Sequence, residues 1–315
     1  MQITSEVLKL LRKLNGGKAS PNNKLIVDYV GQSASDQIKQ LLLQDRPCMV
    51  SRFGSNELDA TLRTYERQQC QGFVNRAIRY VKGESAAFWW DRSIRKRMSN
   101  VAGFFPATDR FLTRFGERIL EDIDQIDVLG SWREDEFRLR SYFPNAQRIH
   151  LIDLEPFRHN SPWSAALAGK KVLVIHPFVE SIQKQYQKRN DLFANPEVLP
   201  EFDLKVIKAV QSNGKNRVDF SSWFAALDHM CDQINKHDFD TAVIGAGAYG
   251  LPLAAFVKRL GKQSIHLGGA TQLLFGIKGH RWDASYQEFY NGHWVRPLSS
   301  EKPARADLVE QGCYW

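Results

Sequence analysis

The sequence predicts an α/β protein with a mostly parallel, Rossmann-like sheet, helices on both faces and a helical insertion. Short apolar runs recur along the chain, and each is followed by a turn containing Gly, Pro or His and then by an amphipathic stretch. The runs are apolar throughout instead of alternating with polar residues, as strands buried on both faces should be. Strands that alternate with helices in this way are typical of a parallel sheet.

Each element follows from its own pattern. The strand candidates are the apolar runs in 46–54, 126–130, 148–153, 170–178, 204–210, 239–250 and 264–269. Helical periodicity predicts helices over 33–44, 108–123 and 221–236. In the last of these, one face collects the apolar side chains, namely Trp223, Phe224, Leu227, Met230, Cys231 and Ile234.

The 315 residues suit one domain over 1–315, because no low-complexity linker divides the chain. The segment 70–118 differs from its surroundings, since it is helical, basic and aromatic, and we expect it to form an excursion over the sheet edge. The tail 297–315 resembles a loop, and we expect Tyr314 and Trp315 to pack back onto the body.

Composition narrows the classes of function. The net charge of +8 is a modest excess, and its basic residues are mixed with acidic ones, so nucleic acid is not an expected partner. Four widely spaced cysteines show no metal-site spacing, as is ordinary in a reducing compartment. No segment approaches the roughly 20 apolar residues of a membrane span, and the first residues lack the apolar core of a signal peptide. We therefore expect a cytoplasmic protein.

The segment VIGAGAYGLPLAA contains Gly245, Gly247 and Gly250 in the G-x-G-x-x-G spacing, after a strand and before a helix. Glycines there let the backbone approach a phosphate at a helix N-terminus. A dinucleotide site also needs an acid about 20 residues on, at the end of the next strand. That strand ends in His266-Leu267 and two glycines, without an acid. A nucleotide pyrophosphate is therefore favoured over a nicotinamide or flavin cofactor, and tight helix packing is the alternative.

The segment SRFGSNEL, residues 51–58, places Arg52 and Glu57 at the carboxyl edge of a strand. The arginine can bind a phosphate with two hydrogen bonds. The glutamate can hold a divalent cation that bridges two phosphates, the usual manner of Mg²⁺, and Gly54 permits a tight turn between them. The structural alternative is a salt bridge between Arg52 and a first-turn helix carboxylate.

Two other segments end strands on the same edge. His176 in VIHPF stands where open α/β sheets bind ligands, although a structural hydrogen bond would explain it equally. The loop 266–282 contains Gly268 and Gly269, and then the cationic Lys278 and Arg281 with His280 between them. It can close over phosphates or be an ordinary basic loop. Nucleophile-elbow, H-E-x-x-H and P-loop patterns are absent from the sequence.

In this order, these segments resemble a family of bacterial glycosyltransferases with the GT-D fold. RFGSNEL is similar to their R-F-G-D-x-E signature, and the resemblance extends through IDVLGSW, VIHPF, GAGAYGLPLAA, IHLGGATQLLFGIKGHRW and the closing GCYW. It implies a Rossmann-like core and transfer of a sugar from a nucleotide diphosphate donor, with a UDP-sugar the favoured donor. The acceptor would be a glycan or a lipid-linked glycan in surface polysaccharide or glycoprotein assembly.

The resemblance also implies roles for residues. Glu57 matches the signature glutamate, which would engage Mn²⁺ or Mg²⁺ and the donor diphosphate, with Arg52, Phe53 and Gly54 on the donor side. Gly245, Gly247, Tyr249 and Gly250 would form a backbone cradle in which Tyr249 stacks or hydrogen-bonds. The remaining donor contacts would come from His176, Gly268, Gly269, Lys278 and Arg281.

The chain departs from the signature at one position, because Ser55 replaces the aspartate. Metal binding would then rely on Glu57 and the diphosphate or be lost, and Asp59 could substitute only if the helix start is bent. A nucleotide-sugar-binding protein without turnover is therefore a second hypothesis, and a dinucleotide-dependent oxidoreductase is a third. The general base is open among Asp153, Glu155, His176 and His266. A lipid-linked acceptor would suit contact of the segment 76–118 with the inner membrane surface.

Overall fold

The computed structural model describes residues 2–16 and 25–315, so residue 1 and residues 17–24 of the predicted 1–315 domain lie outside the described residues. Seven parallel strands form one sheet in the order β3-β2-β1-β7-β6-β4-β5. This sheet confirms the predicted Rossmann-like α/β class. The strands are β1 (Cys48–Ser51), β2 (Val128–Ser131), β3 (Gln147–His150), β4 (Lys171–His176), β5 (Asp203–Lys208), β6 (Thr241–Ile244) and β7 (Gln263–His266).

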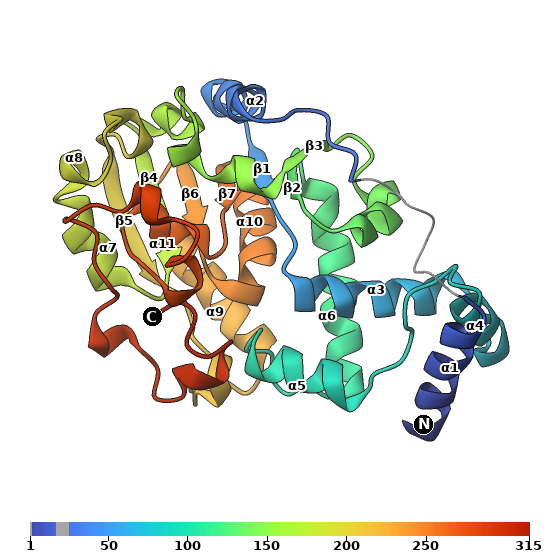
Figure 1. Cartoon of the computed structure of the whole chain (residues 1–315). Helices are drawn as coiled ribbons and strands as arrows, with labels where there is room; N and C mark the ends of the chain where they lie inside the picture. Colours follow the sequence, from blue (N-terminus) through green and yellow to red (C-terminus); the bar gives the residue numbers. More distant parts are fainter. Residues whose placement is uncertain (1, 17–24) are drawn as a thin grey trace.

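The central strands are buried on both faces, as their continuous apolar runs predict. In β4, Leu173 and Ile175 join one hydrophobic core while Val172 and Val174 join the other. The first core is covered by α3 (Ser55–Gln69), α6 (Asp109–Asp122), α9 (Trp223–Ile234) and α10 (Gly250–Arg259). The second is covered by α2 (Gln32–Leu43), α7 (Val179–Tyr186), α8 (Arg189–Leu192) and α11 (Ala270–Leu274) (Figure 1).

The predicted excursion is helical but is not uniformly peripheral. It contains α4 (Phe73–Val81), α5 (Arg92–Asn100) and most of α6, which packs into the first core. Its aromatic side chains are largely buried: Phe88, Trp89, Trp90, Phe104 and Phe115. Those rings pack inside the protein instead of forming a surface. At the far end, α1 (Gln2–Leu14) packs on α4 around a small separate core.

The topology opens a crevice at the centre of the sheet. The first strand, β1, lies beside the last, β7. After β1 the chain enters α3 on one face, and after β7 it enters α11 on the other. Ligands of open α/β sheets bind where neighbouring strands send the chain to opposite faces. Among the described residues, no helix has the length and apolar character required to cross a bilayer.

Candidate active site

The segments that follow β1, β2, β4, β6 and β7 line one cavity of ≈ 190 Å³ at the carboxyl edge of the sheet. The structure brings together most of the residues singled out from the sequence, because parallel strands end on the same edge. Of the residues predicted to bind the donor or the metal, ten border the cavity: Arg52, Phe53, Gly54, Glu57, His176, Gly245, Gly247, Gly268, Gly269 and Arg281. Three others, Tyr249, Gly250 and Lys278, do not line it.

Arg52 follows the last residue of β1 and is half-buried in the cavity wall. Its guanidinium lies 5.6 Å from the centre of the Trp132 ring, and within residues 2–16 and 25–315 it forms no hydrogen bond or ion pair. Burial lowers the pKa of Arg52, and nearby Glu57 opposes that change. Arginine nevertheless stays protonated in proteins. The cavity therefore contains a cation whose donors are free for an anionic ligand.

Glu57 lies in the first turn of α3, and its carboxylate folds back over Gly54. A Cβ at residue 54 would lie 2.0 Å from Glu57 Oε2, so the carboxylate can take this position only while residue 54 is glycine; φ at Gly54 is not positive. Burial raises the pKa of Glu57, while its own N–H and Arg52 act in the opposite direction. No ion pair neutralises Glu57 among the described residues. The salt bridge considered as the alternative for Arg52 and Glu57 has not formed.

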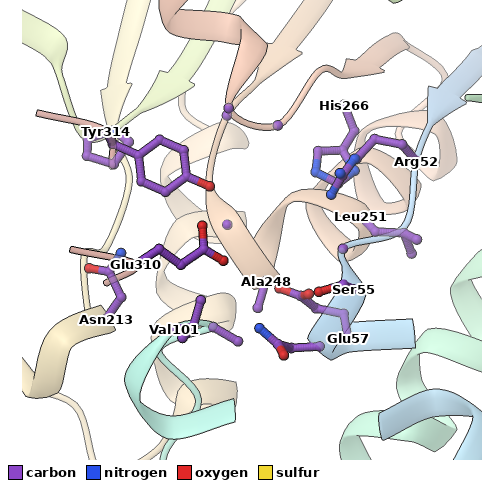
Figure 2. A pocket seen from close by; sticks show the side chains of 18 of the residues that line it. Arg52, Ser55, Glu57, Val101, Asn213, Ala248, Leu251, His266, Glu310 and Tyr314 are labelled. Carbon is purple, nitrogen blue, oxygen red and sulfur yellow. The ribbon is translucent and has the colours of Figure 1, made fainter. Parts of the chain in front are cut away.

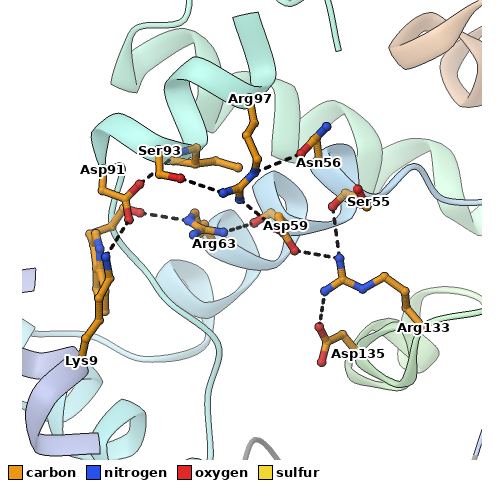
Figure 3. Close-up of polar contacts among 12 residues, drawn as sticks. Lys9, Ser55, Asn56, Asp59, Arg63, Asp91, Ser93, Arg97, Arg133 and Asp135 are labelled. Atoms are coloured by element: carbon orange, nitrogen blue, oxygen red, sulfur yellow. Dashed lines mark hydrogen bonds and ion pairs between the residues drawn. The ribbon is translucent and has the colours of Figure 1, made fainter. Parts of the chain in front are cut away.

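The signature to which this segment is similar has an aspartate where this chain has Ser55, and no nearby carboxylate of α3 takes its place in the cavity. Asp59 points away from the cavity, where Arg97 Nη2 lies 2.9 Å and Arg133 Nη1 3.0 Å from its carboxylate oxygens (Figure 3). Arg133 also donates to the Ser55 carbonyl. Asp59 therefore does not take the role of the signature aspartate that Ser55 replaces. Asp59 lies on the opposite side of α3 and is already paired.

The donor set fits a hard divalent cation only in part. No group of three or more His, Cys, Asp or Glu side chains suited to a metal occurs in the described part of the chain. Glu57 provides an oxygen ligand without an ion-pair partner, and Mg²⁺ commonly takes one or two carboxylates plus phosphate oxygens and water. A cation at Glu57 would thus depend on a bound phosphate for most of its coordination.

The two histidines of the cavity are buried, with 4% and 3% of His176 and His266 exposed. The Phe178 N–H donates to His176 Nδ1 over 3.0 Å, which places the proton of the neutral ring on Nε2. His266 Nδ1 lies 3.1 Å from Ser51 Oγ. Burial lowers the pKa of both to about 3, and for His266 the charge of Arg52 adds to this effect. They are neutral hydrogen-bonding groups at pH 7 and weak bases.

The other two candidates for the general base lie outside the cavity lining. Asp153 accepts the Gly31 N–H over 3.0 Å. Glu155 accepts hydrogen bonds from Arg158 and Tyr286. Both carboxylates therefore act in loop structure. The carboxylates that do line the cavity are Glu57 and Glu310, and Glu310 was not singled out from the sequence.

In the G-x-G-x-x-G segment, a different physical reason accounts for glycine at each of the three positions. Gly247 has φ +53° and open space around it, so the turn after β6 needs glycine and exposes backbone to the cavity. A side chain at Gly245 would overlap His176 and Thr271. A side chain at Gly250 would overlap the His266 ring, so this third glycine serves packing of α10 and not ligand contact.

Three predicted ligand side chains have other positions. Tyr249 stacks on Trp223 with ring centres 4.9 Å apart, and its hydroxyl pairs with Ser212, so it belongs to the core. Phe53 is 1% exposed, and only its carbonyl is used near the site, where it accepts the Trp132 indole N–H. Lys278 lies over the Tyr290 ring, because the backbone pairing of 277–278 with 295 turns it aside.

The C-terminal tail forms part of the cavity wall. From the sequence we expected only that its last residues pack onto the body. Trp315 is buried against Phe178, as expected for the closing residues. Arg281 Nη1 donates to Tyr314 Oη over 2.9 Å, and burial raises the pKa of Tyr314 to about 12. Figure 2 shows Tyr314 and Glu310 across the cavity from Arg52 and Glu57. The closing segment GCYW is far from residue 52 along the chain, so the sequence does not predict that the two lie in one cavity.

Comparison of the chain with protein-family models, with curated proteins and with solved structures finds no match. Within the described residues, the site is a crevice that contains an arginine and a carboxylate without ion-pair partners, exposed turn backbone and two neutral histidines.

Proposed function

We propose that this protein is a glycosyltransferase that moves a sugar from a nucleotide diphosphate donor to a glycan or lipid-linked glycan acceptor. The observation that carries the proposal is the meeting of Arg52, Glu57 and the Gly247 turn in one cavity, where neither charge has an ion-pair partner among the described residues. The resemblance of RFGSNEL and the later segments to GT-D glycosyltransferases supports the same function. A UDP-sugar is the donor that we expect first.

The proposed reaction displaces a nucleoside diphosphate from the anomeric carbon of the sugar. The bond from that carbon to the diphosphate oxygen breaks as the acceptor hydroxyl attacks and its proton passes to the departing phosphate or to water, so negative charge grows on the departing phosphate as the bond breaks. Arg52 can stabilise this charge with two hydrogen bonds. The N-terminus of α3, at Gly54 and Ser55, presents backbone N–H groups and positive partial charge to the same region.

Glu57 would hold the divalent cation, which when bound supplies further positive charge to the diphosphate. His176 and His266 would contribute neutral hydrogen bonds, because their lowered pKa values disfavour proton abstraction at pH 7. Trp132 offers an exposed aromatic face beside Arg52 against which a planar ring could stack.

A nucleotide-sugar-binding protein without turnover is a second candidate, favoured by one observation. Ser55 replaces a carboxylate, and Asp59 is held by Arg97 and Arg133 instead of facing the cavity. Such a protein would keep the donor contacts and lose transfer. An oxidoreductase has less support, because the described end of β7 places two glycines next to the cavity and no acid for a ribose.

The test is a panel of nucleotide-sugars, nucleoside diphosphates and NAD, each with Mn²⁺, Mg²⁺ or chelator. We expect a nucleoside diphosphate and its sugar to raise the melting temperature, and slow donor hydrolysis to accompany transferase activity. Stabilisation without hydrolysis or transfer, across acceptors, would favour the binding protein. Stabilisation by NAD alone, or by no nucleoside diphosphate, would overturn the proposal.

A further inference from the structure

A surface outside the cavity has a composition that the proposed function does not use. Of the fourteen large apolar side chains that are exposed among the described residues, seven belong to α1 and α4. These are Val7, Leu10, Leu11, Leu14, Phe73, Val74 and Ile78. Single exposed apolar residues are normal, but a concentration of them marks an interaction surface. We call these two helices the α1–α4 face.

The apolar side chains of α1 form a stripe that is turned outward. Positions 7, 10, 11 and 14 have the spacing of one helix face. The opposite side of α1 makes the internal contacts, since Ser5 and Leu8 are buried and Arg12 reaches the Ser85 carbonyl. Leu14 is 75% exposed and Leu10 57%. The stripe therefore has no partner among the described residues.

The second helix, α4, packs beside α1 and adds exposed apolar side chains of its own. α4 turns Tyr80 into the small core shared with Leu8 and leaves Val74 and Ile78 exposed one turn apart. Figure 1 shows α1 and α4 packed together at the end of the molecule, beyond the C-terminus of α3. The N-terminus of α3 borders the cavity, and its 15 residues span about 22 Å. The α1–α4 face thus lies well away from the cavity.

Charge indicates what this face contacts. Residues 2–14 and 73–82 contain six basic residues and one acidic residue, Glu6, which pairs with Lys9. Lys13, Arg76 and Lys82 form no ion pair with the described residues. A second copy of the chain would bring like charges together in a symmetric contact, which is unfavourable. Apolar stripes bordered by Lys and Arg are suited to the interface of an anionic bilayer.

We propose that the α1–α4 face docks on an anionic lipid bilayer, with the α1 stripe entering the headgroup region and Lys13, Arg76 and Lys82 contacting lipid phosphates. This assigns the membrane contact to α1 and α4, and not to the buried rings of Phe88, Trp89, Trp90, Phe104 and Phe115. The docking does not depend on transfer chemistry, although it would hold the cavity near a lipid-linked molecule.

Flotation with vesicles tests the proposal. The full chain should float with vesicles of phosphatidylcholine and phosphatidylglycerol, less with phosphatidylcholine alone, and less as NaCl rises. Leu10→Glu with Leu14→Glu should weaken association by at least about tenfold. Lys13→Glu with Lys82→Glu should weaken it similarly. The matched controls are Leu43→Glu on α2, 59% exposed, and the exposed Lys236→Glu, and both should float like the parent.

The melting temperature and nucleotide-induced stabilisation of each variant show whether the fold and the cavity are intact. If a variant no longer floats but keeps its melting temperature and its stabilisation by nucleotide, the proposal is supported. The flotation result does not depend on whether the proposed function is correct. Absence of flotation by the parent, equal association with neutral vesicles, or variants that float unchanged would overturn it. A parent dimer in light scattering that Leu10→Glu with Leu14→Glu dissociates would also overturn it, because the face would then contact a second copy.

Discussion

The two sides of α3 differ in how they treat charge. On the cavity side, Arg52 and Glu57 have no ion-pair partner among the described residues. On the outer side, two residues further along, Asp59 lies between Arg97 and Arg133. Charges that are paired within the protein contribute to its stability, whereas charges kept unpaired in a cavity are available to a ligand. The same helix thus has charges paired within the protein on one side and charges facing the cavity on the other.

The largest expected effect concerns the cavity side and pH. His176 and His266 have pKa values of about 3 when folded, against a usual 6.5. Since the folded pKa is lowered, their contribution is complete above pH 6.5 and is lost as the pH falls towards 3. When the pH falls from 7 to 5, each histidine should lower the free energy of unfolding by about 2 kcal/mol. Urea unfolding against pH measures this loss.

His176→Gln should flatten that profile, and the exposed His229→Gln should leave it unchanged. The readout is the slope between pH 7 and 5, so it does not depend on how stable the variant is at neutral pH. A His176→Gln profile as steep as the parent's would show that the histidine is not the buried neutral group described for the cavity.

The next effect should be on ligand binding. Arg52→Met removes a cation that has no ion-pair partner among the described residues, and a charged hydrogen bond to a ligand contributes about 1.5–3 kcal/mol, or roughly 10–150-fold in affinity. Calorimetry with the nucleoside diphosphate that stabilises the parent should show this loss, while the apo melting temperature hardly changes. The exposed Arg92→Met is the matched control. Full affinity in Arg52→Met would contradict the role of the arginine.

Asp59→Asn should show the reverse pattern. It leaves Arg97 and Arg133 without their half-buried carboxylate, so we expect a loss of about 1–2 kcal/mol of stability. Stabilisation by nucleotide should stay as in the parent, because Asp59 does not border the cavity. The exposed Asp232→Asn should stay within about 0.5 kcal/mol. A binding defect in Asp59→Asn with unchanged stability would contradict the structural role that we give to Asp59.

The smallest effect on stability should come from Glu57→Gln. Burial raises the pKa of Glu57, so ionisation opposes folding, and the variant should melt slightly higher than the parent at pH 7. The difference should widen as the pH rises above 4.5, the usual pKa of a glutamate. Mn²⁺-dependent stabilisation should disappear in Glu57→Gln and persist in the exposed Glu117→Gln. A retained metal response would exclude Glu57 as the ligand.

Much of the fold could be predicted because its signals are local. Each apolar run became a strand within a few residues of its expected bounds, and 33–44, 108–123 and 221–236 became α2, α6 and α9. The shared edge of Arg52, His176, Gly245 and Gly268 was also predictable, since residues that follow parallel strands lie together. What local patterns could not supply was the direction of each side chain.

Three residues illustrate that limit. Tyr249 follows a glycine turn, but the turn aims its ring at Trp223. Lys278 follows the basic loop, but pairing with residue 295 directs it to Tyr290. Glu310 and Tyr314 reach the cavity from the far end of the chain. In each case the outcome depends on contacts between residues that are distant in the sequence.

Local sequence patterns are enough to predict the strands, the helices that cover them and the sheet edge at which the candidate site residues lie. Those features follow from periodicity and glycine placement, which act over a few residues. Which charges are satisfied depends instead on contacts between elements distant in the sequence. Asp59 is paired because Arg97 and Arg133 come from α5 and the turn after β2, on the side of α3 away from the cavity. Arg52 and Glu57 border the cavity and have no ion-pair partner among the described residues.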